Sequence, residues 1–138
     1  MEVSLAVIAD YANLAQDGKL NIMGIFQEVN PPVLPFPLPQ MYLVVSFVAG
    51  PAEFDTTKDI KIALLDNDGN EMLALEGQAH VSRPRRPGSR AYMNQLIGLS
   101  GITFERSGDY AFAILIGGET RATVSLHINE PTQEVTDA

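Results

Sequence analysis

Residues 59–82, DIKIALLDNDGNEMLALEGQAHVS, decide the fold. In both halves of this stretch, apolar side chains recur at every second position, which is typical of a β-strand with one buried face. Between the halves lies Asn67-Asp68-Gly69-Asn70, a strong signal for the tight turn of a hairpin. We therefore predict two antiparallel strands, at 59–66 and 71–82.

Working outward, the same period of two recurs along the rest of the chain. Segment 91–99 (AYMNQLIGL) also fits a short helix, but Leu96-Ile97-Gly98-Leu99 favours a strand. Gly24 interrupts an otherwise alternating segment and indicates a bulge or a close approach of backbone. Further strands are predicted at 3–9, ending at Asp10-Tyr11, and at 20–28, 41–49, 110–116 and 120–128.

About eight short strands with no convincing helix predict an all-β fold, a single-domain antiparallel β-sandwich of immunoglobulin-like or Greek-key type. The chain of 138 residues suits one domain, which we place at 1–128, followed by a flexible acidic C-terminal tail at 129–138. In immunoglobulin-like sandwiches, a tyrosine at the start of a penultimate strand pins the corner between the sheets. Tyr110, in Gly108-Asp109-Tyr110, is predicted to have this structural role.

The composition excludes several classes of protein. With no cysteine, the chain has no disulfide, thiolate zinc site, iron–sulfur cluster or cysteine nucleophile. A formal net charge of −8 opposes binding to nucleic acid and to anionic membranes. The first apolar stretch breaks at Asp10, too early for a secretory signal or a membrane span. We expect a cytoplasmic protein with neither nucleic acid nor membrane as a partner.

Two stretches of the opening third resemble a known family. Residues 9–12 (ADYA) are followed by 17–26 (DGKLNIMGIF), and together they resemble the start of a family of short, uncharacterised bacterial β-sandwich proteins, a domain of unknown function. The resemblance extends more loosely through the 66–69 turn and the strand that begins at 108–110. It implies the sandwich fold and a bacterial source. It transfers no catalytic residue, because that family carries no assigned activity.

Few residues indicate catalysis or metal binding. The string 66–71 (DNDGNE) is rich in oxygen ligands, but a calcium loop centred on its glycine would place Leu64 and Leu75 at ligand positions. A hairpin turn explains the string without a metal. His80 and His127 each lie alone in a predicted strand and are interpreted as surface residues. The chain has neither a nucleophile elbow nor a phosphate-binding loop, so we predict no enzyme, no cofactor and no metal.

The loop at 83–90, RPRRPGSR, contains four of the nine basic residues: Arg83, Arg85, Arg86 and Arg90. Arginine binds carboxylate and phosphate with two parallel hydrogen bonds. The loop is therefore a candidate site for an anion or an acidic partner, including an acidic patch on a second copy. The alternative, a solvated loop whose arginines pair with local acidic residues, is favoured because exposed charge runs usually contribute little.

A second unusual segment is 31–39, PPVLPFPLP. Proline lacks a backbone N–H, so this segment cannot be a central strand and is predicted to be an extended crossing between the sheets or along an edge. Pro35, Phe36, Pro37 and Leu38 could dock into a partner's aromatic groove or cover an edge of the sandwich. Covering is favoured, because exposed Phe36 and Leu38 would form an apolar patch.

Together these features predict a non-catalytic module for protein interaction or self-assembly, with a protein partner or a second copy of the chain. The alternative is a module that binds a small anionic ligand or a carbohydrate; an aromatic content of 7% without tryptophan disfavours sugar stacking. A third function, hydrolase or isomerase, requires a cleft that holds His80 or His127 beside a carboxylate.

Overall fold

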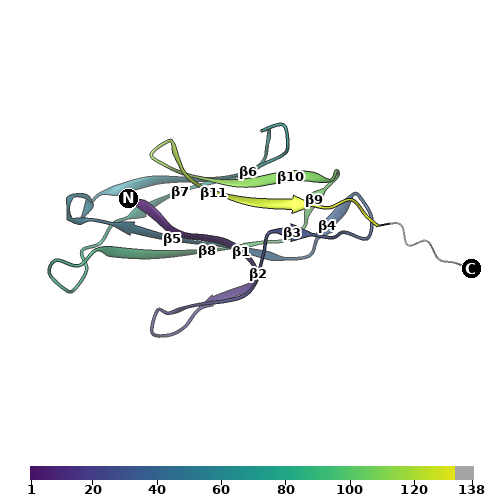
Figure 1. The fold of residues 1–138 in the computed structure, drawn as a ribbon. Coiled ribbons are helices and arrows are strands. Elements are labelled where there is room, and N and C mark those ends of the chain that lie inside the picture. Colours follow the sequence, from purple (N-terminus) through teal and green to yellow (C-terminus); the bar gives the residue numbers. More distant parts are fainter. Residues whose placement is uncertain (133–138) are drawn as a thin grey trace, which may run out of the picture.

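The computed structural model describes residues 1–132, in which two β-sheets pack face to face (Figure 1). One sheet has four strands, in the order β2 (Leu20–Phe26), β1 (Glu2–Leu14), β5 (Met41–Ala49) and β8 (Ala91–Leu99). The other has five, in the order β3 (Glu28–Val29), β11 (Glu119–Ile128), β10 (Gly108–Ile116), β6 (Thr57–Leu65) and β7 (Glu71–His80). A separate pair consists of β4 (Phe36–Leu38) and β9 (Ile102–Phe104).

This architecture confirms the predicted all-β sandwich. Every strand pair is antiparallel apart from β3 and β11. Within the described residues, the one short helical turn is η1 (Pro51–Glu53), and no helix has the length and hydropathy to cross a membrane. Of the tail predicted at 129–138, residues 133–138 lie outside the part of the chain that the structure describes.

Several predicted elements can be compared with the observed ones. The hairpin is confirmed, since β6 and β7 pair antiparallel and the Gly69 N–H donates to the Asp66 carbonyl oxygen at 3.0 Å. Segment 91–99 is the strand β8, not a helix. The predicted end of the first strand at Asp10-Tyr11 is wrong. β1 continues to Leu14 because its last residues pair with the start of β2, where Leu14 lies opposite Leu20.

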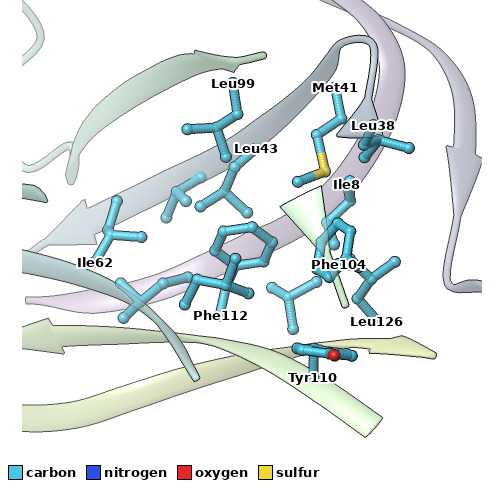
Figure 2. Packing of buried hydrophobic residues seen from close by; sticks show 14 of the residues in the cluster. Ile8, Leu38, Met41, Leu43, Ile62, Leu99, Phe104, Tyr110, Phe112 and Leu126 are labelled. Atoms are coloured by element: carbon cyan, nitrogen blue, oxygen red, sulfur yellow. The ribbon is translucent and has the colours of Figure 1, made fainter. Parts of the chain in front are cut away.

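The core lies between the two sheets (Figure 2). Ile8 and Leu43 from the four-stranded sheet point toward Phe112 and Leu126 from the five-stranded sheet, and all four are at most 1% exposed. Because successive side chains of a strand point to opposite faces, these core residues identify which set of side chains in each strand points inward. The remaining set points outward.

β4 and β9 lie at one end of the core. The Phe104 ring of β9 packs edge-on against Tyr110 with 4.9 Å between the ring centroids. The Tyr110 hydroxyl donates to the Arg106 carbonyl oxygen at 2.6 Å, which is the backbone contact of a corner tyrosine.

The proline-rich segment lies along this end of the sandwich. Phe36 pairs with Phe104 and Leu38 with Ile102, so β4 is the extended crossing that proline permits. Leu38 is buried in the core cluster and Phe36 is half-buried against it, whereas Pro35 and Pro37 are exposed. These contacts are those of an edge cover, and the buried Leu38 side chain is not available to a partner's groove.

Candidate interaction surfaces

The two parts of the motif that carries the family resemblance meet in space. In the β1–β2 pair, Ala9 lies opposite Ile25 and Tyr11 opposite Met23, so Asp10 and Gly24 face each other between them. Gly24 has φ +73°, and a Cβ at this position would lie 2.6 Å from the Asp10 Oδ2 atom. The neighbour is thus a side chain and not the backbone that was predicted: the missing Cβ of Gly24 leaves room for the Asp10 carboxylate.

The outward face of the four-stranded sheet is unusual in its chemistry. The chain has 17 acidic and 9 basic residues, yet among the described residues the outward positions of this sheet carry no charged side chain except Glu2 at one end of β1. We call the following set the uncharged face: Leu5, Val7, Ala9, Tyr11 and Asn13 of β1; Asn21, Met23 and Ile25 of β2; Tyr42, Val44, Ser46 and Val48 of β5; Tyr92, Asn94, Leu96 and Gly98 of β8.

Large apolar and aromatic side chains protrude from the uncharged face. Tyr92 is 71% exposed, Met23 65%, Ile25 51% and Tyr11 45%. The Tyr11 ring meets Tyr42 edge-on with 5.6 Å between the centroids. Burying such side chains against another apolar surface is favourable, at roughly 25 cal/mol per Å².

The polar side chains of the uncharged face hydrogen-bond to one another. Asn21 Nδ2 donates to Asn13 Oδ1 at 3.0 Å, across the β1–β2 pair. Ser46 Oγ donates to Asn94 Oδ1 at 2.6 Å, across the β5–β8 pair. Because a buried polar group is costly only where it lacks a partner, covering this face would leave few groups unsatisfied.

The outward face of the five-stranded sheet is different. Its strands carry charged pairs, including Lys61 Nζ with Glu71 Oε1 at 2.7 Å and Arg121 Nη2 with Glu119 Oε2 at 3.0 Å. The carboxylate of Glu71 raises the pKa of Lys61. This is the usual surface of a solvated sheet.

Both histidines lie on exposed strand surfaces. His80 Nδ1 lies 3.4 Å from the Thr57 hydroxyl oxygen. His127 Nδ1 lies 2.6 Å from Asp109 Oδ1, but the two side chains are 47% and 81% exposed. Within the described residues, no group of three or more acidic, histidine or cysteine side chains is arranged to hold a metal ion.

The Asp66 carboxylate is used within its own turn. Its Oδ1 atom accepts hydrogen bonds from the backbone N–H groups of Asp68 and Asn70, each at 2.9 Å. These bonds, that from Asn70 above all, hold the pKa of Asp66 below its ordinary value. The string that superficially resembles a calcium loop is therefore a hairpin turn stabilised by its first aspartate.

The structure separates the four arginines of the 83–90 loop. Arg83 Nε donates to Asp55 Oδ2 at 2.6 Å, which is the local pairing that the alternative interpretation predicts. Arg85, Arg86 and Arg90 are exposed and form no ion pair with any residue that the structure describes. Arg83 is thus paired locally, whereas the anion-site interpretation stays a prediction for Arg85, Arg86 and Arg90.

Sequence reasoning missed the uncharged face. Its residues come from four segments between positions 5 and 98, and they form one surface only through the strand order β2-β1-β5-β8. A usable signal was present: in 3–9 and 41–49 both alternating sets of side chains are predominantly apolar. That pattern is typical of strands that are covered on both faces.

Comparison with known proteins gives a family but no activity. No curated protein matches the chain. Among solved structures, the Pseudomonas fluorescens alkylpurine DNA glycosylase AlkC bound to DNA containing an abasic site analog matches with 8% identity and a TM-score of 0.48. That match covers 94% of this chain but 30% of the glycosylase. Residues 4–129 match a family of unknown function, DUF6941, and the chain belongs to that family.

Proposed function

We propose that this protein is a non-catalytic self-assembly module in which the uncharged faces of two copies pack together. The observation that carries the proposal is the absence of charge from the described outward positions of β1, β2, β5 and β8 between Leu5 and Gly98. Elsewhere the chain is strongly acidic.

The lack of charge on this face allows a second copy of the acidic chain to occupy it. Two chains of net charge −8 repel each other, and like charges brought together at an interface cost several kcal/mol. The uncharged face reduces this cost, because Glu2, which lies in line with Val48 and Tyr92 at one end, is the one carboxylate among the described outward positions of this sheet. A basic partner would instead be attracted to the acidic surfaces elsewhere.

The size of the face predicts a weak dimer. Four strands about 4.8 Å apart, each contributing about seven residues of about 3.3 Å, span roughly 440 Å² per copy. Two copies would bury roughly 900 Å², which is at the low end for a specific interface and typical of transient association. Met23, Ile25, Tyr11 and Tyr92 would provide most of the buried apolar area.

Sedimentation velocity over a wide range of protein concentration tests this proposal. Met23→Glu and Tyr92→Glu alter exposed positions near opposite edges of the face, and the matched control is Met72→Glu on β7, where Met72 is 39% exposed. Met23→Glu and Met72→Glu change the net charge equally, so any difference between their dimer dissociation constants is due to the position of the new carboxylate.

We expect the wild type and Met72→Glu to dimerise alike. Met23→Glu should weaken association by at least about 30-fold, since burying an unpaired carboxylate costs 2 kcal/mol or more. A wild type that stays monomeric at millimolar concentration, or a control that is weakened as much as Met23→Glu, would overturn the proposal.

Two further observations support a non-catalytic role in a bacterial cytoplasm. A hydrolase or isomerase needs a histidine and a carboxylate held together in a cleft, whereas His127 and Asp109 pair on an open sheet surface. A chain without cysteine gains no stability from an oxidising compartment, and the family resemblance implies bacteria.

A further inference from the structure

The 83–90 loop forms one wall of a cavity. A hollow of about 400 Å³ lies between the loop, which contributes Arg83, Arg85 and Arg86, and the segment just after β5, which contributes Pro51 and Phe54. Phe54 is half-buried against the small cluster of Ala49, Val81 and Ala91. The cavity is therefore lined by arginine, phenylalanine and proline residues.

The acidic residues beside the cavity are already paired. Glu53 contacts the Met1 ammonium and lies 3.2 Å from Lys58 Nζ, and these hydrogen bonds lower the pKa of its carboxyl group. Asp55 pairs with Arg83. Arg85 and Arg86 are thus left with positive charge that no described carboxylate neutralises, in a chain whose net charge is −8.

The loop is also partly ordered before any ligand binds. Its start is anchored because the Asp55 N–H donates to the Val81 carbonyl oxygen at 2.7 Å and the Asp55 carboxylate holds Arg83. Near its end, the Ser89 N–H donates to the Arg86 carbonyl oxygen at 3.2 Å. With Pro84 and Pro87 fixing two φ angles, the loop loses less entropy on binding than a flexible arginine run would.

We infer that this cavity binds an oxyanion carried on a flat apolar group, with Arg85 and Arg86 holding the oxyanion and Phe54 and Pro51 contacting the apolar part. Guanidinium groups bind carboxylate and phosphate oxygens in the same geometry, so the chemistry is shared by an acidic ligand of either kind. The site is independent of the uncharged face, and either proposal can fail alone.

Titrations followed by ¹H–¹⁵N NMR test the inference, using benzoate and phenyl phosphate as probes at constant ionic strength. Benzyl alcohol tests the apolar part without charge, and inorganic phosphate tests the charge without the apolar part. The variants are Arg85→Gln and Arg86→Gln. The matched control is Arg121→Gln on β11, which removes the same charge from a residue paired with Glu119.

We expect at least one of the two aryl oxyanions to cause saturable chemical-shift changes of the Phe54 amide and of amides in the 83–90 loop. This probe should bind more tightly than benzyl alcohol or inorganic phosphate. Arg85→Gln or Arg86→Gln should weaken this binding about tenfold, as for loss of one charge-assisted hydrogen bond, and Arg121→Gln should not. Preference for benzoate identifies a carboxylate ligand, and preference for phenyl phosphate a phosphate ligand.

Phe54→Leu separates the two halves of the site. It should weaken the aryl probes while leaving inorganic phosphate unchanged, because it removes the ring and keeps both arginines. Absence of saturable shifts up to about 10 mM probe, the range of very weak binding, would overturn the inference. An equal effect of Arg85→Gln and Arg121→Gln would also overturn it, since net charge alone would then explain the affinity.

Discussion

Gly24→Ala is the substitution whose cost can be worked out most directly from the structure. Gly24 adopts φ +73°, and a Cβ there would lie 2.6 Å from Asp10 Oδ2 and 3.1 Å from Asp10 Cβ. The backbone conformation alone costs an L-residue about 1–2 kcal/mol. Overpacking against Asp10 adds about 1–2 kcal/mol, so Gly24→Ala should lower the free energy of unfolding by about 2–4 kcal/mol.

Two variants separate these contributions. Gly18 has φ +83°, and a Cβ added there would meet nothing within 4 Å. Gly18→Ala should therefore lower the free energy of unfolding by the backbone contribution alone, about 1–2 kcal/mol. Asp10→Ala removes the nearest carboxylate atom but keeps the Cβ atom. The double variant Asp10→Ala/Gly24→Ala should therefore recover about 1 kcal/mol of the loss, as a coupling energy between residues in contact.

Urea unfolding followed by circular dichroism measures all four variants against the wild type. A lower urea midpoint, with an unchanged dependence of the free energy of unfolding on urea concentration, would show that the variant changes stability alone. Equal costs for Gly24→Ala and Gly18→Ala would refute the steric contact. Additive effects of Asp10→Ala and Gly24→Ala would also refute it, because the reasoning requires that the two side chains compete for one space.

Three further predictions concern other parts of the fold. Tyr110→Phe removes the hydrogen bond to the Arg106 carbonyl oxygen and should cost about 1–2 kcal/mol in urea unfolding without changing the circular dichroism spectrum. Asp66→Asn should make the free energy of unfolding depend less on pH in the acid range. The folded-state pKa of Asp66 lies below its ordinary value of 3.8, so its contribution is present above that pH and is lost as the pH falls through the lowered pKa; equal urea midpoints for variant and wild type at neutral pH would contradict this. Leu38→Ala should cost about 2–4 kcal/mol if β4 covers the core, whereas Val33→Ala, at a side chain 59% exposed, should be nearly neutral in the same assay.

The sequence predicts those features that depend on short-range chemistry. The 67–70 turn requires only its own residues, and the alternation on either side of it places β6 and β7 to within two residues at each end. The extended crossing at β4 follows from proline, and the corner contact of Tyr110 from a local pattern. The predicted end of β1 is wrong because Asp10 and Tyr11 interrupt the apolar pattern of the segment. The strand continues because its last residues pair with β2, and this pairing cannot be inferred from the segment itself.

Strand order could not be obtained in this way. An eight-strand alternation is compatible with several connections, and each assigns different neighbours to β1 and β8. The pairing of the local acidic residues near the arginine loop was equally inaccessible. Asp55 and Arg83 are 28 positions apart, and only the approach of the β5–β6 connection to the β7–β8 connection brings them together.

The uncharged face also accounts for the predominantly apolar sequence of β5. MYLVVSFVA is a run of predominantly apolar residues, and such runs occur where both faces of a strand are covered. Within the described chain, the five-stranded sheet covers one face of β5, through Leu43, Val45 and Phe47. On the other face Val44 is shielded by neighbouring side chains, while Tyr92 and Met23 protrude at the margins. β5 therefore has the composition of a doubly covered strand but one covering layer within the described chain. Under the proposal above, a second uncharged face would supply the other layer and keep most acidic side chains out of the contact.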